Sequence, residues 1–108
     1  MQSLQVTELG PFAAAEAPLL LDVREPWEVA IARLDLPPAT TLAMPMREVP
    51  ARLAEIDRRR PVVCICHHGV RSAQVVAFLQ RQGHERVYNL AGGIDAWSTR
   101  VDPRTPRY

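Results

Sequence analysis

A cysteine that precedes a short polar loop is the clearest candidate for chemistry in this chain. Residues 61–66 are apolar apart from two cysteines, residues 67–70 have loop character, and apolar residues recur at helical spacing after Arg71 and Ser72. A continuous apolar run predicts a strand that is buried on both faces. Cys66 would then lie at the carboxyl end of a strand and just before a helix, where open α/β sheets bind ligands and where a thiolate is favoured. We therefore predict that Cys66 is a nucleophilic or sulfur-carrying cysteine.

The composition is that of an ordinary globular domain. The 108 residues are 47% hydrophobic and 23% charged, and the formal net charge is +1. This length suits one domain, expected over residues 1–108. The charge balance favours neither a nucleic-acid nor a membrane partner. No signal peptide or long apolar segment is recognisable, so a cytoplasmic location is expected.

Strands and helices alternate along the predicted secondary structure. We expect strands at residues 5–7, 19–23, 41–44, 61–66 and 86–90, and helices at residues 7–17 (capped by Thr7), 47–57 (interrupted or started by Pro50), 72–82 and from 94 onward. The alternation predicts an α/β fold with a parallel four- to five-stranded sheet that is flanked by helices on both faces. The Pro37-Pro38 pair predicts a loop at residues 33–40, and two further prolines predict an extended tail at residues 101–108.

The two cysteines are expected to be free thiols. Cys64 and Cys66 are two residues apart in a predicted strand, so their Cα atoms would be about 6.6 Å apart with parallel side chains, a poor geometry for a disulfide. We expect Cys64 to be a small buried apolar residue. The cluster of these cysteines with His67 and His68 lacks the spacing of a zinc site, and His84 stands alone. No metal and no cofactor are expected.

Three stretches, in this order and at this separation, resemble the single-domain rhodanese family of sulfurtransferases. They are Leu20-Leu21-Asp22-Val23-Arg24-Glu25, Cys66-His67-His68-Gly69-Val70-Arg71-Ser72 and Leu90-Ala91-Gly92-Gly93-Ile94-Asp95-Ala96-Trp97. The resemblance implies a five-stranded parallel sheet and a Cys66 that carries sulfur as a persulfide. It also implies that residues 67–71 form the binding loop, with Ser72, Asp22 and Arg24 as supports. At residues 34–39 the chain departs from the family pattern, because the usual histidine and glycine are absent there.

The expected reaction moves sulfur from a donor such as thiosulfate to cyanide, a thiol or a protein acceptor. Backbone N–H groups of the loop would stabilise the negative sulfur, and Arg71 is expected to contact the anion. His67 and His68 either assist at the mouth of the site or only line it. Trp27 and Trp97 are expected in the core.

Two other functions remain open. Cysteine-dependent phosphatases place one residue more between cysteine and arginine than the four found here, so a phosphatase or arsenate reductase is disfavoured by loop size. A non-catalytic rhodanese-type binding or regulatory module is the second alternative, although such modules generally lack the cysteine that is present here.

Overall fold

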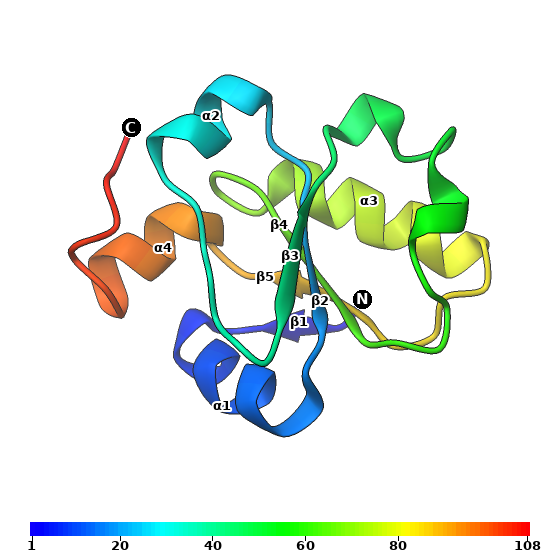
Figure 1. Cartoon of the computed structure of the whole chain (residues 1–108), viewed down its shortest axis with the longest axis horizontal. Coiled ribbons are helices and arrows are strands. Elements are labelled where there is room, and N and C mark those ends of the chain that lie inside the picture. The colour runs from blue at the N-terminus through cyan, green and yellow to red at the C-terminus, as the bar shows by residue number, and fades with distance from the viewer.

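The protein, described here over residues 1–108 by a computed structural model, is built on a five-stranded parallel sheet (Figure 1). The strand order is β1-β5-β4-β2-β3, and every neighbouring pair is parallel. The strands are β1 (Ser3–Leu4), β2 (Leu19–Asp22), β3 (Thr40–Ala43), β4 (Val62–Ile65) and β5 (Val87–Leu90). The predicted fold class is confirmed, with five strands.

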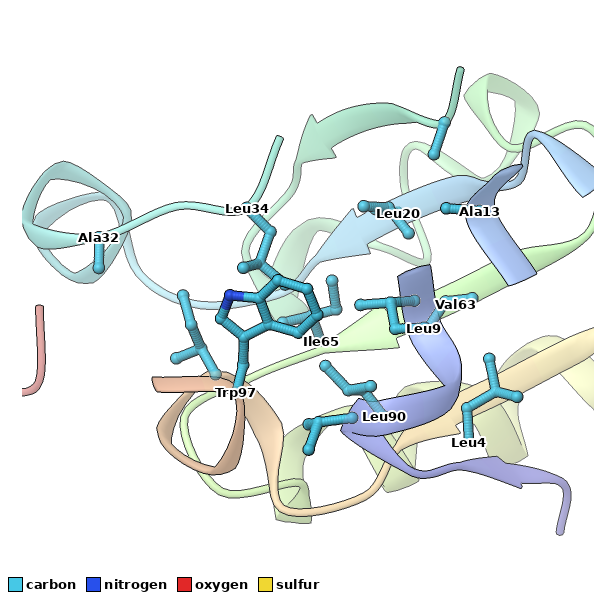
Figure 2. Packing of buried hydrophobic residues seen from close by; sticks show 13 residues of the cluster. Leu4, Leu9, Ala13, Leu20, Ala32, Leu34, Val63, Ile65, Leu90 and Trp97 are labelled. Carbon is cyan, nitrogen blue, oxygen red and sulfur yellow. The ribbon is translucent and has the colours of Figure 1, made fainter. Parts of the chain in front are cut away.

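Helices cover both faces of this sheet. They are α1 (Val6–Glu16), α2 (Pro26–Ile31), α3 (Val70–Arg81) and α4 (Gly93–Arg100). One apolar cluster joins α1 and α4 to the sheet, and a second cluster joins α3 to the opposite face. Trp97 of α4 is buried as expected, and Figure 2 shows its indole ring beside Leu34 and Ile65. None of the four helices combines the length and the hydrophobicity that a membrane span requires.

The central position of β4 explains its unbroken apolar sequence. Val63 and Ile65 belong to the cluster under α1 and α4, whereas Val62 and Cys64 belong to the cluster under α3. Both faces of the strand are therefore buried, so its sequence does not alternate between apolar and polar residues. The chain leaves β4 at Cys66, which is at the carboxyl edge of the sheet.

The N-terminal prediction was wrong by a few residues. β1 comprises Ser3 and Leu4, and α1 begins at Val6 with Gln5 as its cap instead of Thr7. The Gln5 backbone N–H donates to the Glu8 carboxylate at 2.7 Å, which completes a capping box. Thr7 was the more obvious cap by residue type, but the reciprocal Gln5–Glu8 pair sets the start of the helix.

The predicted helix at residues 47–57 is also wrong. Two short 3-10 helices, Met46–Glu48 and Leu53–Glu55, stand there, separated by a turn at Pro50. Proline has no N–H to continue a helix, so the segment breaks into separate turns. Val49 and Ile56, which flank this region, are nevertheless buried.

The tail after α4 is not helical, but it does not simply extend into solvent either. Thr105 N–H donates to the Asp102 carbonyl at 3.0 Å and closes a turn. The remaining residues run from α4 towards α2, as the red segment in Figure 1 shows. The last side chain, Tyr108, therefore reaches Glu28 of α2.

Candidate active site

Cys66 lies at the bottom of the loop that joins β4 to α3, hereafter the Cys66 loop (residues 66–72). Its side chain is 1% exposed, and the thiol is free. The backbone N–H of Gly69 donates to Sγ at 3.1 Å, and that of Ser72 donates at 3.4 Å. Gly69 adopts φ +99°, which side-chain-bearing residues rarely tolerate. The loop therefore curls so that two amides point at a single sulfur atom.

A buried polar chain continues from this sulfur to β5. Ser72 Oγ is 3.3 Å from Cys66 Sγ and donates its proton to Asn89 Oδ1 at 2.5 Å. The Asn89 amide group in turn donates to the Gly69 carbonyl at 3.1 Å. Because the single hydroxyl proton of Ser72 is engaged with Asn89, the oxygen faces the Cys66 thiol as an acceptor.

The N-terminal residues of α4 hold the first part of the Cys66 loop from the other side. Ile94 N–H donates to the Cys66 carbonyl at 2.9 Å, and Asp95 N–H donates to the His67 carbonyl at 3.1 Å. Gly93 makes this approach possible, since a Cβ there would stand 2.4 Å from the His67 oxygen and 2.5 Å from the Cys66 oxygen. The carbonyls are fixed by α4, which leaves the amides of the loop free to face Sγ.

Comparison with known proteins shows the family of this chain. The Rhodanese-like domain family matches residues 7–100. The chain belongs to this family. A protein of Allochromatium vinosum named sulfurtransferase is 45% identical over 86 residues, which cover 80% of this chain and 77% of that protein.

Two further matches support the family and its fold. The thiosulfate sulfurtransferase GlpE of Actinobacillus pleuropneumoniae is 49% identical over 45 residues, which cover 42% of each chain. A crystal structure of a rhodanese-related protein from Thermoplasma volcanium superposes with a TM-score of 0.82 at 29% identity, covering 94% of both chains. Sequence and fold therefore place this chain in a sulfurtransferase family.

Arg71, near the end of the Cys66 loop, forms an ion pair with a carboxylate. Its guanidinium donates to the two Glu28 carboxylate oxygens at 2.6 and 2.8 Å, and Glu28 is 3% exposed. The hydrogen bonds from Arg71, against the effect of burial, lower the pKa of Glu28 to about 2. The expected charge of Arg71 beside the loop is present, but Glu28 neutralises much of it.

Asp22 and Arg24 form a second buried ion pair near the carboxyl end of β2. Arg24 Nη2 donates to Asp22 Oδ2 at 2.6 Å, and Nε donates to Oδ1 at 2.8 Å. The remaining guanidinium protons reach the carbonyls of Glu28 and Ala32 and the hydroxyl of Tyr108. Burial alone would lower the pKa of Arg24, but hydrogen bonds with Asp22 and Tyr108 outweigh it and raise the pKa. All five donors of a fully buried cation are thus satisfied.

The two loop histidines lie differently. His67 is half-buried between the rings of His68 and Tyr108, each 4.0 Å from it between centroids, and burial lowers the pKa of His67. His68 is largely exposed, with Nδ1 3.9 Å from Asp95. Val70, between the loop glycine and Arg71, is 68% exposed. The loop therefore presents His68 and Val70 at its mouth.

The other predictions near the site have mixed outcomes. Cys64 is buried, as predicted, and its burial raises the pKa of the thiol. Trp27 is 62% exposed and packs edge-to-face on Tyr108 at 5.8 Å, so its assignment to the core was wrong. As an early residue of a short surface helix, it faces away from the sheet. No group of three or more His, Cys, Asp or Glu side chains is placed to hold a metal ion.

Three residues of this region were missed by sequence reasoning. Asn89 was detectable, because a polar residue in an apolar strand needs buried partners. Glu28 belongs to a second capping box, in which it accepts from the Glu25 N–H at 3.0 Å. The capping box explains why a helix starts there, but it does not predict the buried ion pair of Glu28 with Arg71. Tyr108 gave no signal, since its contacts are made 80 and 84 residues away in the sequence.

Proposed function

We propose that this protein transfers sulfane sulfur through a persulfide on Cys66, with thiosulfate as a competent donor and cyanide, a thiol or a protein thiol as acceptor. The Cys66 thiolate attacks the outer sulfur of the donor, a new S–S bond forms, and the donor's bond breaks. With thiosulfate, sulfite leaves with the electron pair. The acceptor then attacks the terminal sulfur, and the Cys66 thiolate is released.

The observation that carries this proposal is the convergence of the Gly69 and Ser72 N–H groups on Cys66 Sγ at 3.1 and 3.4 Å. Such preorganised donors stabilise negative charge in a site that excludes water. The outer sulfur of a persulfide would stand about 2 Å beyond Sγ, so a buried cysteine can still present a reacting atom at the mouth. The sulfurtransferase names of relatives support the same chemistry.

Loop size argues against a phosphatase. Only four residues, His67 to Val70, separate Cys66 from Arg71, and the amides of Gly69 and Ser72 meet at one atom. A phosphoryl group needs each of its oxygens to be met by a donor, and this requires a wider loop. The engagement of Arg71 with Glu28 also removes the cation that would bind a phosphate dianion.

The direct test is mass spectrometry of the protein after incubation with thiosulfate, followed by cyanide. We expect one added sulfur on Cys66 and its loss as thiocyanate. The Cys66→Ser variant should show neither product. The Cys64→Ser variant is the matched control, because Cys64 is equally buried but receives no amide hydrogen bond, and it should keep most of the activity.

Two results would contradict the proposal. Hydrolysis of an aryl phosphate without any sulfur adduct would indicate a phosphatase. A folded protein that forms no adduct with thiosulfate or with a small organic persulfide would indicate a binding module.

A further inference from the structure

The C-terminal segment returns to the Cys66 loop and is anchored on the way. Asp102 N–H donates to the Trp97 carbonyl at 2.9 Å, and the turn that follows is closed by Thr105. Arg107 then pairs with Asp95 of α4, with Nε 2.9 Å from Oδ1. These contacts deliver Tyr108 to a place between α2 and the loop.

The hydroxyl of Tyr108 connects the two buried ion pairs of the site. It accepts a hydrogen bond from Arg24 Nη1 at 3.0 Å and donates to Glu28 Oε2 at 2.8 Å. Burial raises the pKa of Tyr108 to about 12, so the hydroxyl stays protonated and can donate at neutral pH. One phenol thus links the Asp22–Arg24 pair to the Glu28–Arg71 pair.

Through these contacts Tyr108 reaches both ends of the Cys66 loop. At the first end its ring stacks on His67, the residue after Cys66, with 4.0 Å between centroids and 14° between planes. At the second end its hydroxyl donates to the Glu28 carboxylate, which also accepts from the Arg71 guanidinium. Arg71 precedes Ser72, whose N–H points at Sγ.

We propose that Tyr108 is a positioning residue that clamps both ends of the Cys66 loop and so keeps the Gly69 and Ser72 amides directed at the sulfur. This role rests on the proposed function for its catalytic consequence. Its physical effect is to keep the two amides in place to stabilise the Cys66 thiolate, and this can be measured without sulfur transfer. Donors stabilise charge only when they are already in place, and small misplacements of a site cost large factors in rate.

The test compares Tyr108→Leu and Tyr108→Phe with Tyr88→Phe as the matched control. Tyr88 is also partly buried and packs edge-to-face on Phe12 at 5.1 Å, within the cluster under α1 and α4. Two readouts are needed for each variant. The first is the rate of Cys66 alkylation by iodoacetamide against pH, followed by peptide mass spectrometry. The second is the rate of sulfur transfer from thiosulfate to cyanide.

In Tyr108→Leu we expect the alkylation profile of Cys66 to move to higher pH and sulfur transfer to fall by about tenfold to a hundredfold. The Phe variant keeps the stack on His67 and loses the hydroxyl's links to Arg24 and Glu28, so it should fall between Leu and wild type. The Tyr88→Phe control should match the wild type in both readouts.

A Tyr108→Leu profile and transfer rate equal to those of the wild type would overturn the positioning role. If the Leu variant does not fold, the Phe variant decides, because an unchanged alkylation profile there removes the hydroxyl bridge from the argument. If alkylation shifts as expected but no variant, including the wild type, transfers sulfur, the positioning role stands and the proposed function fails.

Discussion

Two regions lie at opposite ends of α3: the Cys66 loop before its first turn and a surface hollow beside its last turn. They are roughly 18 Å apart along the helix and differ in how their polar groups are partnered. The hollow has a volume of about 1030 Å³. Gln82 and His84, on either side of a chain reversal, line it on one side. The turn at Asp57, Arg58 and Arg59 lines it on the other.

At the Cys66 end, buried polar atoms form a connected chain of donors and acceptors from Sγ through Ser72 and Asn89, and one buried side-chain nitrogen, His67 Nε2, lacks a partner. At the other end, both ring nitrogens of the buried His84 lack a hydrogen-bond partner. No cysteine lines the hollow. Volume alone is therefore a poor guide to chemistry here, and the direction of donors towards one atom is the better one.

The largest expected difference between the two ends comes from one substitution made at both, Gly93→Ala and Gly83→Ala. Both glycines have positive φ, +63° and +96°. A Cβ at Gly93 would meet the backbone oxygens of Cys66 and His67, whereas at Gly83 it would meet the flexible tip of Arg58 at 2.8 Å. We expect Gly93→Ala to cost about 2–5 kcal/mol of unfolding free energy, and Gly83→Ala only the ~1–2 kcal/mol of a left-handed residue.

Urea denaturation and sulfur-transfer assays on both variants would check this. Gly93→Ala should also lose most of its activity, because the two loop carbonyls are pushed off the α4 amides. Equal losses at both positions would show that backbone strain, and not contact with the loop, sets the cost.

The sequence predicted the fold and the position of Cys66 because both depend on local patterns. The apolar run of β4 and the abrupt change at Cys66 are visible in neighbouring residues, and so are the three motifs. Boundaries were less accurate where two local signals competed, as at Thr7 and Gln5, or where a proline divided a segment, as at Pro50.

The partners that hold the site could not be predicted, since they come from remote parts of the chain. Arg71 and Glu28 are 43 residues apart, and Ser72 and Asn89 are 17 apart. No sequence period relates such residues, and their pairing follows only once the strand order places their elements side by side. Trp27 was misplaced for a similar reason, because a six-residue helix carries too few residues to define its buried face.

The second prediction concerns the acid stability of the Cys66 end. Arg71 lowers the pKa of Glu28 to about 2, below the ordinary glutamate value of 4.5. A carboxylate with a lowered folded-state pKa stabilises the fold above about pH 4.5, and this contribution is lost as the pH falls towards 2. We expect Glu28→Gln to be less stable by on the order of 3 kcal/mol at pH 7, with the difference from wild type shrinking between pH 4.5 and 2.

Chemical denaturation across this pH range gives the measurement. Glu55→Gln is the control, because Glu55 pairs with Arg52 on the exposed surface, where ion pairs contribute little. A Glu28→Gln deficit that does not change with pH would assign the loss to packing instead of charge.

A smaller effect is expected from Ser72→Ala. The change removes the hydroxyl between Cys66 and Asn89 but leaves the Ser72 N–H in place. When Cys66 ionises, the Ser72 hydroxyl can turn its proton from Asn89 to the sulfur. A hydrogen bond to a charged group contributes about 1.5–3 kcal/mol, so sulfur transfer should fall by about tenfold to a hundredfold. Ser98→Ala is the matched control, since Ser98 is equally buried and donates only to the Ile94 carbonyl of its own helix. Comparable losses in both variants would remove Ser72 Oγ from the mechanism.

The smallest effect belongs to His84, at the hollow end of α3. Burial, followed by the nearby charge of Arg58, lowers the pKa of His84. The unfolded chain therefore binds the proton more readily, and stability present above about pH 6.5 is lost as the pH falls below it. His84→Leu removes both this titration and two unpartnered nitrogens, and we expect it to gain about 1 kcal/mol at pH 8 and more at pH 5.5. His84→Gln keeps a polar side chain without the titration, so its stability relative to wild type should improve only on acidification. Urea midpoints at the two pH values separate the terms, and a wild type whose stability is equal at both would show that His84 finds water at this end of the helix.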